Sequence, residues 1–393
     1  MFGHPRYKPT SIPSPSPSTR SKAMYAPPRF LTGKFFIWLC LFLIGFPILL
    51  WNHPNLENLS VPYARPQPRP NAQFVAHGDS KCLPEVSAEL IKAATAKRAT
   101  CRKYSPFATG RARVATVTAH FGKPQEHYQK ALKTHLQHAL VHGTEVRVMC
   151  DPIVDDLWNK PAFILNLLMR EMLKPEKERL EWIQWVDRDT IILDQCRPIL
   201  SFLPPEKARF GSWWRRSSSS DDDNEDEDDK QAPAPANTTN LLVTRDWNGL
   251  NNGIFLLRVN AWAIELFTAI LAFRHYKPEI DLPFTEQSAM EEVLKTEQFR
   301  DQARYVPQHW FNGYEEEGTQ KFLEREDVEG LKERDVRRGD YLVHFAGRGN
   351  RGTLLMAWSG MLEGAGDVWE EGRVQRDVSG EVAEFWRDLG YVV

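Results

Sequence analysis

Two acidic residues follow one of the most apolar stretches of the chain. Residues 182–186 read WIQWV, and Asp187, Arg188 and Asp189 come directly after them. Residues at i and i+2 of an extended segment point to the same side, so the two carboxylates could converge on one cation. Mn²⁺ and Mg²⁺ prefer oxygen ligands of this kind. The pattern predicts a divalent metal site, although pairs of acids at this spacing also occur by chance on protein surfaces.

A histidine much later in the chain could complete such a site. His344 lies at the end of the apolar run YLVHF, which is followed by Ala-Gly-Arg-Gly-Asn-Arg. Its neutral imidazole could serve as a third metal ligand, although a single histidine at the end of an apolar strand is more often a core residue. Gly347 would let the backbone approach phosphate groups, and Arg348 or Arg351 could neutralise charge that develops on a departing diphosphate.

Two further polar segments could contact a substrate. The sequence DWNGLNNG, which begins at Asp246, is typical of a tight turn before a strand. The same turn could offer the carboxylate of Asp246 and the amide of Asn251 to substrate hydroxyl groups. The sequence FTEQSA resembles a helix start with Glu286 in the first turn, where capping is the alternative role. Glu286 and Gln287 would then lie beside the reacting group.

These residues require a sheet that brings strand ends together. Alternating patterns predict strands at 113–119, 146–149, 182–186 and 253–259, and helices at 125–142, 160–173 and 261–274. Gly143 is the expected C-cap of the first helix. The alternation indicates an α/β fold with a doubly wound, Rossmann-like sheet of parallel strands. Ligands bind at the carboxyl ends of such strands, where Asp187 and Asp189 are expected.

The regions outside this pattern predict a membrane-anchored protein. Residues 1–34 are basic and rich in Pro and Ser, as in a disordered cytosolic tail, and residues 35–51 are uncharged and suit a transmembrane anchor. The positive flank places the remainder in the lumen. A cleaved signal peptide is the alternative, but no A-x-A-like site follows. Residues 52–105 read as a Pro-rich stem and 106–393 as the catalytic domain, with a disordered acidic insertion at 215–238.

Charge and cysteine content indicate which ligands and which cellular compartment to expect. The net charge of −2 gives no sign of nucleic-acid binding. Cys40 lies in the expected span, and the other four cysteines allow three pairings, among which we favour Cys82 with Cys101. Zinc is not expected, because no CxxC motif accompanies them. Sequons at Asn58 and Asn237 are consistent with a luminal glycoprotein.

Several of these segments, taken in order, resemble one enzyme family. VTAHFG, LWNKPA, WVDRDT, GLNNGIFLLR, TEQSA and HFAGR are similar to motifs of glycosyltransferase family 34. That family contains fungal Golgi α-mannosyltransferases and α-galactosyltransferases and plant xyloglucan xylosyltransferases. The resemblance covers roughly residues 113–351, apart from the acidic insertion. It implies a GT-A fold, a type II Golgi membrane topology, and a Mn²⁺-dependent transfer that retains anomeric configuration.

The resemblance also implies roles for individual residues. The metal would be held by Asp187, Asp189 and His344. The donor would contact Thr116, His120, Lys160, Asn251, Gly347, Arg348 and Arg351. Gln287 would face the anomeric carbon, with Glu286 and Asp246 beside the sugar. The chain departs from the family pattern in two segments. Family members commonly carry Cys and then Lys where this chain has an Arg-Gly-Asn-Arg loop, and Arg188 stands where a small residue is often found.

The function expected from the sequence is therefore hexose transfer in the Golgi. The donor would be UDP-galactose or GDP-mannose, the acceptor a glycan or glycoprotein, and assembly into a Golgi homo- or hetero-oligomer is a further hypothesis. One alternative is a glycan-binding or scaffolding subunit without activity. The intact DxD and HFxG segments argue against it, but the altered basic loop leaves it open. Another is an aspartate-nucleophile phosphatase, because DRDT resembles DxDx(T/V), although Ile191 stands where Thr or Val is required.

Overall fold

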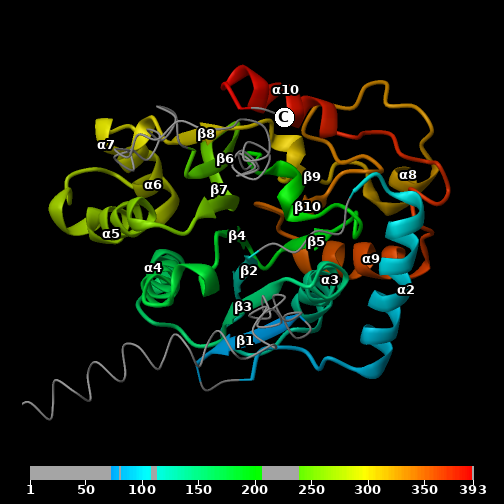
Figure 1. Ribbon diagram of the computed structural model, residues 1–393, viewed down its shortest axis with the longest axis horizontal. Coiled ribbons are helices and arrows are strands. Elements are labelled where there is room, and N and C mark those ends of the chain that lie inside the picture. The colour runs from blue at the N-terminus through cyan, green and yellow to red at the C-terminus, as the bar shows by residue number, and fades with distance from the viewer. Residues whose placement is uncertain (1–71, 79–80, 108–112, 206–238, 392–393) are drawn as a thin grey trace, which may run out of the picture. The chain divides into compact units, whose positions relative to one another are not determined.

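A seven-stranded sheet between two layers of helices forms the centre of the structure, a computed structural model that describes residues 72–78, 81–107, 113–205 and 239–391 (Figure 1). Outside these residues lie the expected tail and membrane anchor, the acidic insertion at 215–238, and the asparagines of both sequons. None of the helices in the described part is both long and apolar enough to cross a membrane.

The sheet is mixed rather than wholly parallel. Its strands are β1 (Gln73–His77), β2 (Val114–Ala119), β3 (Glu145–Met149), β4 (Trp182–Val186), β6 (Leu241–Asp246), β7 (Gly249–Arg258) and β8 (Ala303–Tyr305). They lie in the order β1-β3-β2-β4-β7-β6-β8. The first four are parallel, as expected from the alternating pattern, but β7 runs antiparallel to both β4 and β6.

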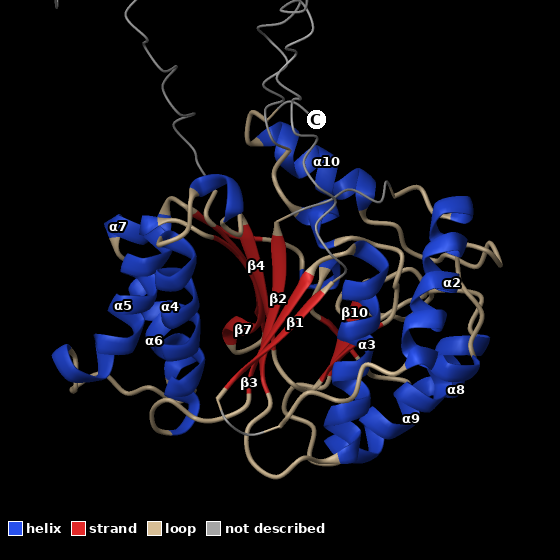
Figure 2. Cartoon of the chain, turned by 60° about the horizontal axis from the view of Figure 1, so that its bottom comes forward, coloured by secondary structure: helices blue, strands red, loops and turns tan. Residues whose placement is uncertain are grey.

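Helices cover both faces of this sheet (Figure 2). On one side lie α4 (Asn159–Met172), α5 (Ala261–Tyr276), α6 (Glu286–Leu294) and α7 (Glu297–Arg300), and on the other α2 (Ala88–Tyr104), α3 (Glu126–His142), α8 (Gly318–Glu324) and α9 (Arg351–Gly364), with α10 (Ser379–Asp388) near the C-terminus. Apolar side chains from both sheet and helices, among them Trp185, Phe255 and Leu266, form the main core. Gly143 ends α3 in the left-handed conformation, φ 71°, as expected of its C-cap.

A small second sheet brings distant parts of the chain together. It contains β5 (Thr190–Ile192), β9 (Gly313–Tyr314) and β10 (Leu342–His344), in the order β5-β10-β9. β10 is antiparallel to β5, and the register places His344 opposite Thr190. Since Thr190 directly follows Asp189, this pairing carries His344 to the end of β4.

The fold begins earlier in the chain than the sequence suggested. β1 pairs with β3 at the edge of the central sheet, and α2 packs against α3. Both elements lie within residues 52–105, which were expected to be an extended stem, so the boundary at residue 106 is wrong. QFVAH is too short, and too close to prolines, to stand out as a strand, but β3 supplies its hydrogen-bond partner.

The favoured cysteine pairing is also wrong. The disulfides are Cys82–Cys150 and Cys101–Cys196, with Cα–Cα distances of 5.3 and 5.1 Å. Cys82 precedes α2, whereas Cys101 lies in its last turn, so the length of the helix separates them. Each disulfide therefore joins the N-terminal segment to the central fold rather than closing a loop within that segment.

Candidate active site

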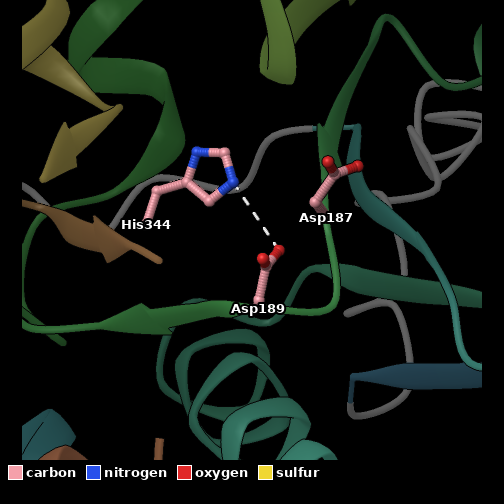
Figure 3. Close-up of side chains that lie close together, drawn as sticks. All are labelled: Asp187, Asp189 and His344. Atoms are coloured by element: carbon pink, nitrogen blue, oxygen red, sulfur yellow. Dashed lines mark ion pairs between the residues drawn. The ribbon is translucent and has the colours of Figure 1, made fainter. Parts of the chain in front are cut away.

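Three predicted metal ligands converge at the end of β4. One ligand atom from each of Asp187, Asp189 and His344 lies within 4.8 Å of the others. Figure 3 shows the imidazole of His344 facing the carboxylate of Asp189, with Asp187 alongside. His344 Nε2 lies 3.6 Å from Asp189 Oδ1. This is the grouping of two carboxylates and one imidazole that the sequence predicted.

Backbone hydrogen bonds hold the three residues in place. The amide of Asp187 donates to the carbonyl of Gly253 at 2.8 Å, which ties the end of β4 to β7. The amide of Phe345 donates to the carbonyl of Asp189 at 3.0 Å, which continues the pairing of β5 with β10. The positions of the ligands are therefore fixed by two sheets and not by a flexible loop.

The protonation of His344 is determined by its neighbour Asn312. His344 Nδ1 lies 2.8 Å from Asn312 Oδ1, and the amide nitrogen of Asn312 donates to Thr244 Oγ1 at 2.7 Å and to Asn251 Oδ1 at 3.0 Å. Because this nitrogen already donates twice, Asn312 must present its oxygen to His344, and Nδ1 must carry the proton. In the neutral imidazole, Nε2 is then the nitrogen that keeps its lone pair, and it faces the carboxylates as a metal ligand would.

The two acids differ in their surroundings. Asp189 is buried, which works to raise its pKa, but His344 and Arg351 more than offset this and lower the pKa to about 2. Arg351 Nε lies 2.9 Å from Asp189 Oδ2. Asp187 is about one-third exposed, and its Oδ1 accepts from Trp185 Nε1 at 2.8 Å and lies 3.2 Å from Lys160 Nζ. These contacts leave Asp187 Oδ2 free to face a ligand.

Lys160 connects the metal group to the start of α6. Its ammonium lies 3.2 Å from Glu286 Oε1 and donates to Asn252 Oδ1 at 2.9 Å. Burial raises the pKa of Glu286, and the charge of Lys160 opposes this rise. Glu286 Oε2 has no hydrogen-bond partner among the described residues. Gln287 Oε1 accepts a hydrogen bond from the backbone amide of Asn252 at 3.1 Å, which fixes the orientation of the Gln287 side chain.

Strained backbone lies beside these groups. Thr285, at the start of α6, has φ 51°, and Asp156, just before α4, has φ 46°. They are the only described residues other than glycine with positive φ, and both border the same cavity. For the β-branched Thr285 this conformation is unfavourable, and such strain is concentrated at functional sites. It places Glu286 and Gln287 at the cavity wall.

This cavity has a volume of about 700 Å³, a size that accommodates a small organic ligand. Most of the predicted site residues border it, namely Asp187, Asp189, His344, Lys160, Asp246, Asn251, Glu286, Gln287, Gly347 and Arg351. Thr116, His120 and Arg348 do not. Thr116 is buried within β2, His120 packs edge-on against Tyr128, and Arg348 pairs with Glu316 at 3.3 Å. Arg351 is thus the basic residue that this loop presents to the cavity.

Asp246 holds two residues of the cavity wall in place, and one of them could not be predicted from the sequence. Asp246 was expected beside the sugar, but its Oδ2 also accepts hydrogen bonds from Asn251 and from the hydroxyl of Tyr314. Tyr314 and Asn312 lie in the sequence FNGY, which reads as an ordinary turn. Only the parallel pairing of β9 with β10 brings them to His344.

Comparison with known proteins assigns the chain to a family. A model of the galactosyl transferase GMA12/MNN10 family matches residues 115–354, a range that contains every residue of the site described above. The chain belongs to this family. It follows that the enzyme is a glycosyltransferase, and the family implies a nucleotide-sugar donor and a glycan acceptor. The resemblance inferred from the motifs is thereby confirmed.

Other comparisons add little to this. One solved structure that is similar to the chain is a glycosyltransferase involved in the glycosylation of the major capsid of PBCV-1. The similarity covers 62% of this chain and 98% of that one, at 14% identity and a TM-score of 0.40. At that score it supports no argument about function. None of the curated proteins compared with the chain matches it.

Proposed function

We propose that the chain is a Golgi enzyme that transfers a hexose from UDP-galactose or GDP-mannose to a glycan or glycoprotein, with retention of anomeric configuration and with Mn²⁺ or Mg²⁺. The convergence of Asp187, Asp189 and His344 in a cavity shared with Glu286 and Gln287 carries this proposal. Family membership supports glycosyl transfer itself. The donor, the metal, the stereochemistry and the Golgi location are the parts that we add.

The donor atoms suit a divalent cation. Two carboxylates supply hard oxygen ligands and the unprotonated Nε2 of His344 supplies a nitrogen ligand, a set that fits Mn²⁺ well. A bound cation would offset the negative charge of the donor's diphosphate. Asn312 fixes the tautomer of His344, and Lys160 and Trp185 fix one oxygen of Asp187. The protein thus prepares the ligands before the substrate binds.

The other residues of the cavity would act on the sugar and the leaving group. The acceptor hydroxyl oxygen would form the new bond to the anomeric carbon from the face that the diphosphate leaves, and its proton would pass to a diphosphate oxygen. Arg351 would stabilise the charge on the departing diphosphate. Gln287, held by the backbone amide of Asn252, would support positive charge on the ring, and Glu286, paired with Lys160, would lie beside the sugar.

The predicted membrane topology fits this reaction and remains part of the proposal. Two disulfides join the N-terminal part of the described chain to its centre. Disulfides persist in oxidising compartments such as the secretory pathway. A luminal catalytic domain held by the predicted anchor at residues 35–51 would meet both nucleotide sugars and glycans there.

Turnover of defined donors tests the proposal. Purified protein is incubated with UDP-galactose, UDP-xylose or GDP-mannose and an acceptor glycan mixture, with and without Mn²⁺, and the anomeric configuration of any product is read by NMR. We expect Mn²⁺-dependent transfer from one donor, and a loss of more than about a thousandfold in Asp187→Ala. Asp301→Ala, which removes an exposed aspartate on another surface, is the matched control.

The outcomes separate the alternatives. Wild-type activity in Asp187→Ala would refute the metal assignment. Mn²⁺-dependent binding of a nucleotide without turnover of any donor would instead favour the inactive scaffolding subunit. Inverted product would leave the metal site standing but exclude the retaining mechanism.

A further inference from the structure

Two exposed aromatic side chains stand at the mouth of the catalytic cavity. Trp247 is 64% exposed and Phe284 is 44% exposed, and both border the cavity. Trp247 lies in the turn between β6 and β7, and Phe284 lies just before α6. Single exposed aromatic residues are common on protein surfaces, but aromatic side chains that line a cavity are typical of a recognition site. Neither residue was assigned a role from the sequence or in the reaction proposed above.

The order of strands places Trp247 on one side of the metal group. β4, which ends at Asp187, lies between β2 and β7. The ends of β2 and β3 contribute Ala119, Phe121 and Met149 to the cavity on one side. Because β7 is antiparallel to β4, the β6–β7 turn lies at the same sheet edge but on the other side. The cavity thus extends in both directions from the metal group, and Trp247 belongs to the arm opposite β2 and β3.

The indole of Trp247 is held in place. Its ring packs edge-on against Tyr314 at 5.5 Å between centroids, and the guanidinium carbon of Arg334 lies 5.0 Å from its centre. Tyr314 is in turn fixed by a hydrogen bond from its hydroxyl to Asp246. A flat apolar surface that is already ordered loses little conformational entropy when a ligand binds to it. Asn248, the next residue, is exposed beside it and also borders the cavity.

We propose that Trp247 forms the acceptor subsite, where the C–H face of a pyranose ring of the acceptor glycan stacks on the indole. This inference rests on the proposed function, because it names where that reaction takes its second substrate. A pyranose has an apolar face bounded by hydroxyl groups, and it matches an aromatic surface bordered by amide and carboxylate groups. The subsite lies on the opposite side of the metal group from the ends of β2 and β3. An acceptor in the subsite would therefore attack a donor that is bound on the β2 and β3 side.

Ligand-observed NMR tests the subsite without requiring turnover. Saturation transfer from the full-length protein to methyl α-D-mannopyranoside and methyl β-D-galactopyranoside is measured across a concentration series. We expect at least one of them to bind, with saturation concentrated on the ring C–H protons of one face. Trp247→Ala should weaken this binding by about tenfold, whereas Trp247→Phe should retain most of it. Tyr276→Ala removes an aromatic residue that is 52% exposed at the end of α5, away from the cavity, and should change nothing.

A nucleotide control separates this inference from the proposed function. Binding of UDP and GDP with Mn²⁺ is measured in the same samples, and in active preparations the acceptor KM of Trp247→Ala should rise about tenfold while the donor KM stays within about twofold. Equal saturation of the methyl glycosides in wild type and Trp247→Ala would overturn the subsite even if transfer occurs. Glycoside binding that depends on Trp247, in a protein that turns over no donor, would support the subsite and refute the proposed function. Loss of self-association in Trp247→Ala, with unchanged glycoside binding, would assign the surface to a second copy of the chain.

Discussion

The position of His344 in the metal group depends on a close contact that one added methyl group would prevent. His344 lies against the backbone of β7 at Gly253, in the middle of a strand, where glycine often marks the close approach of another group. A Cβ at this position would lie 2.4 Å from His344 Cε1 and 3.1 Å from Asn251 Oδ1. Gly253, the last residue of GLNNG, is therefore required by the imidazole of His344 and not by the turn that the sequence suggested.

Gly253→Ala should consequently displace His344 and impair cation binding. We expect affinity for Mn²⁺, measured from the EPR signal of free Mn²⁺, to fall by at least about tenfold, as is typical when the support of a metal ligand is lost, and transfer activity to fall with it. Gly349→Ala is the matched control, because a Cβ there meets no atom within 4 Å. Unchanged Mn²⁺ affinity in Gly253→Ala would show that His344 does not hold the metal in its observed orientation.

The sequence predicted the ligands better than their supports. Asp187, Asp189 and His344 were recognisable because acids and a histidine end apolar runs, where strand ends meet in α/β folds. Asn312 was not, since an Asn-Gly pair reads as a turn and the hydrogen bond to His344 exists only through the pairing of β9 with β10. Likewise, sequence alone left Arg348 and Arg351 equivalent, and only the pairing of Arg348 with Glu316 separates them.

At the scale of elements, helix α3 joins the central sheet to the segment that follows the metal ligands. His135, His138 and His142 lie on one face of α3 and are all buried. Their Nε2 atoms contact Thr190 Oγ1, the carbonyl of Arg197 and the carbonyl of Gln195 at 2.9 to 3.0 Å. The periodicity of the sequence predicted α3 almost to the residue, but it could not show that these histidines attach the helix to β5 and the chain beyond it.

Acid should therefore weaken this attachment. Burial lowers the pKa of His135 and of His142 to about 4, and lowers that of His138 well below its ordinary value of 6.5. Between pH 4 and pH 6.5 these histidines are protonated in the unfolded chain and neutral in the folded chain, so the unfolded chain binds more protons. Stability is thus fully present above pH 6.5 and declines as the pH falls toward 4, by about 1.4 kcal/mol per pH unit for each histidine.

Urea unfolding at pH 7.5 and pH 5.5 measures this effect. His138→Gln keeps a donor near the carbonyl of Arg197 but cannot titrate in this range, so it should reduce the difference in unfolding free energy between the two pH values by about 1 kcal/mol. His275→Gln, which alters an exposed histidine at the end of α5, is the control. An undiminished pH dependence in His138→Gln would indicate that the acid sensitivity arises elsewhere.

At the scale of the whole described molecule, the N-terminal segment is part of the folded unit. Residues 72–105 contribute an edge strand to the central sheet, a helix against α3, and one cysteine to each disulfide. Those contacts are long-range, and the disulfides join cysteines 68 and 95 residues apart. A reading along the sequence meets prolines before β1 and a weakly apolar helix after it, and so assigns both to a stem. The error shows that the boundary of this domain is determined by partners distant in the chain.

The two candidate boundaries predict different behaviour on truncation. A chain that begins at residue 106 would expose the edge of β3, uncover the face of α3 that α2 packs on, and leave Cys150 and Cys196 without their partners. Loss of a native disulfide alone typically costs about 2–5 kcal/mol, a large share of the stability of an ordinary domain. We expect this chain to be insoluble, whereas one that begins at residue 70 should fold and unfold cooperatively. Secretion yield and thermal unfolding of the two chains, with and without reductant, decide between them. A soluble, cooperatively folded chain from residue 106 would mean that β1 and α2 are appendages of the domain after all.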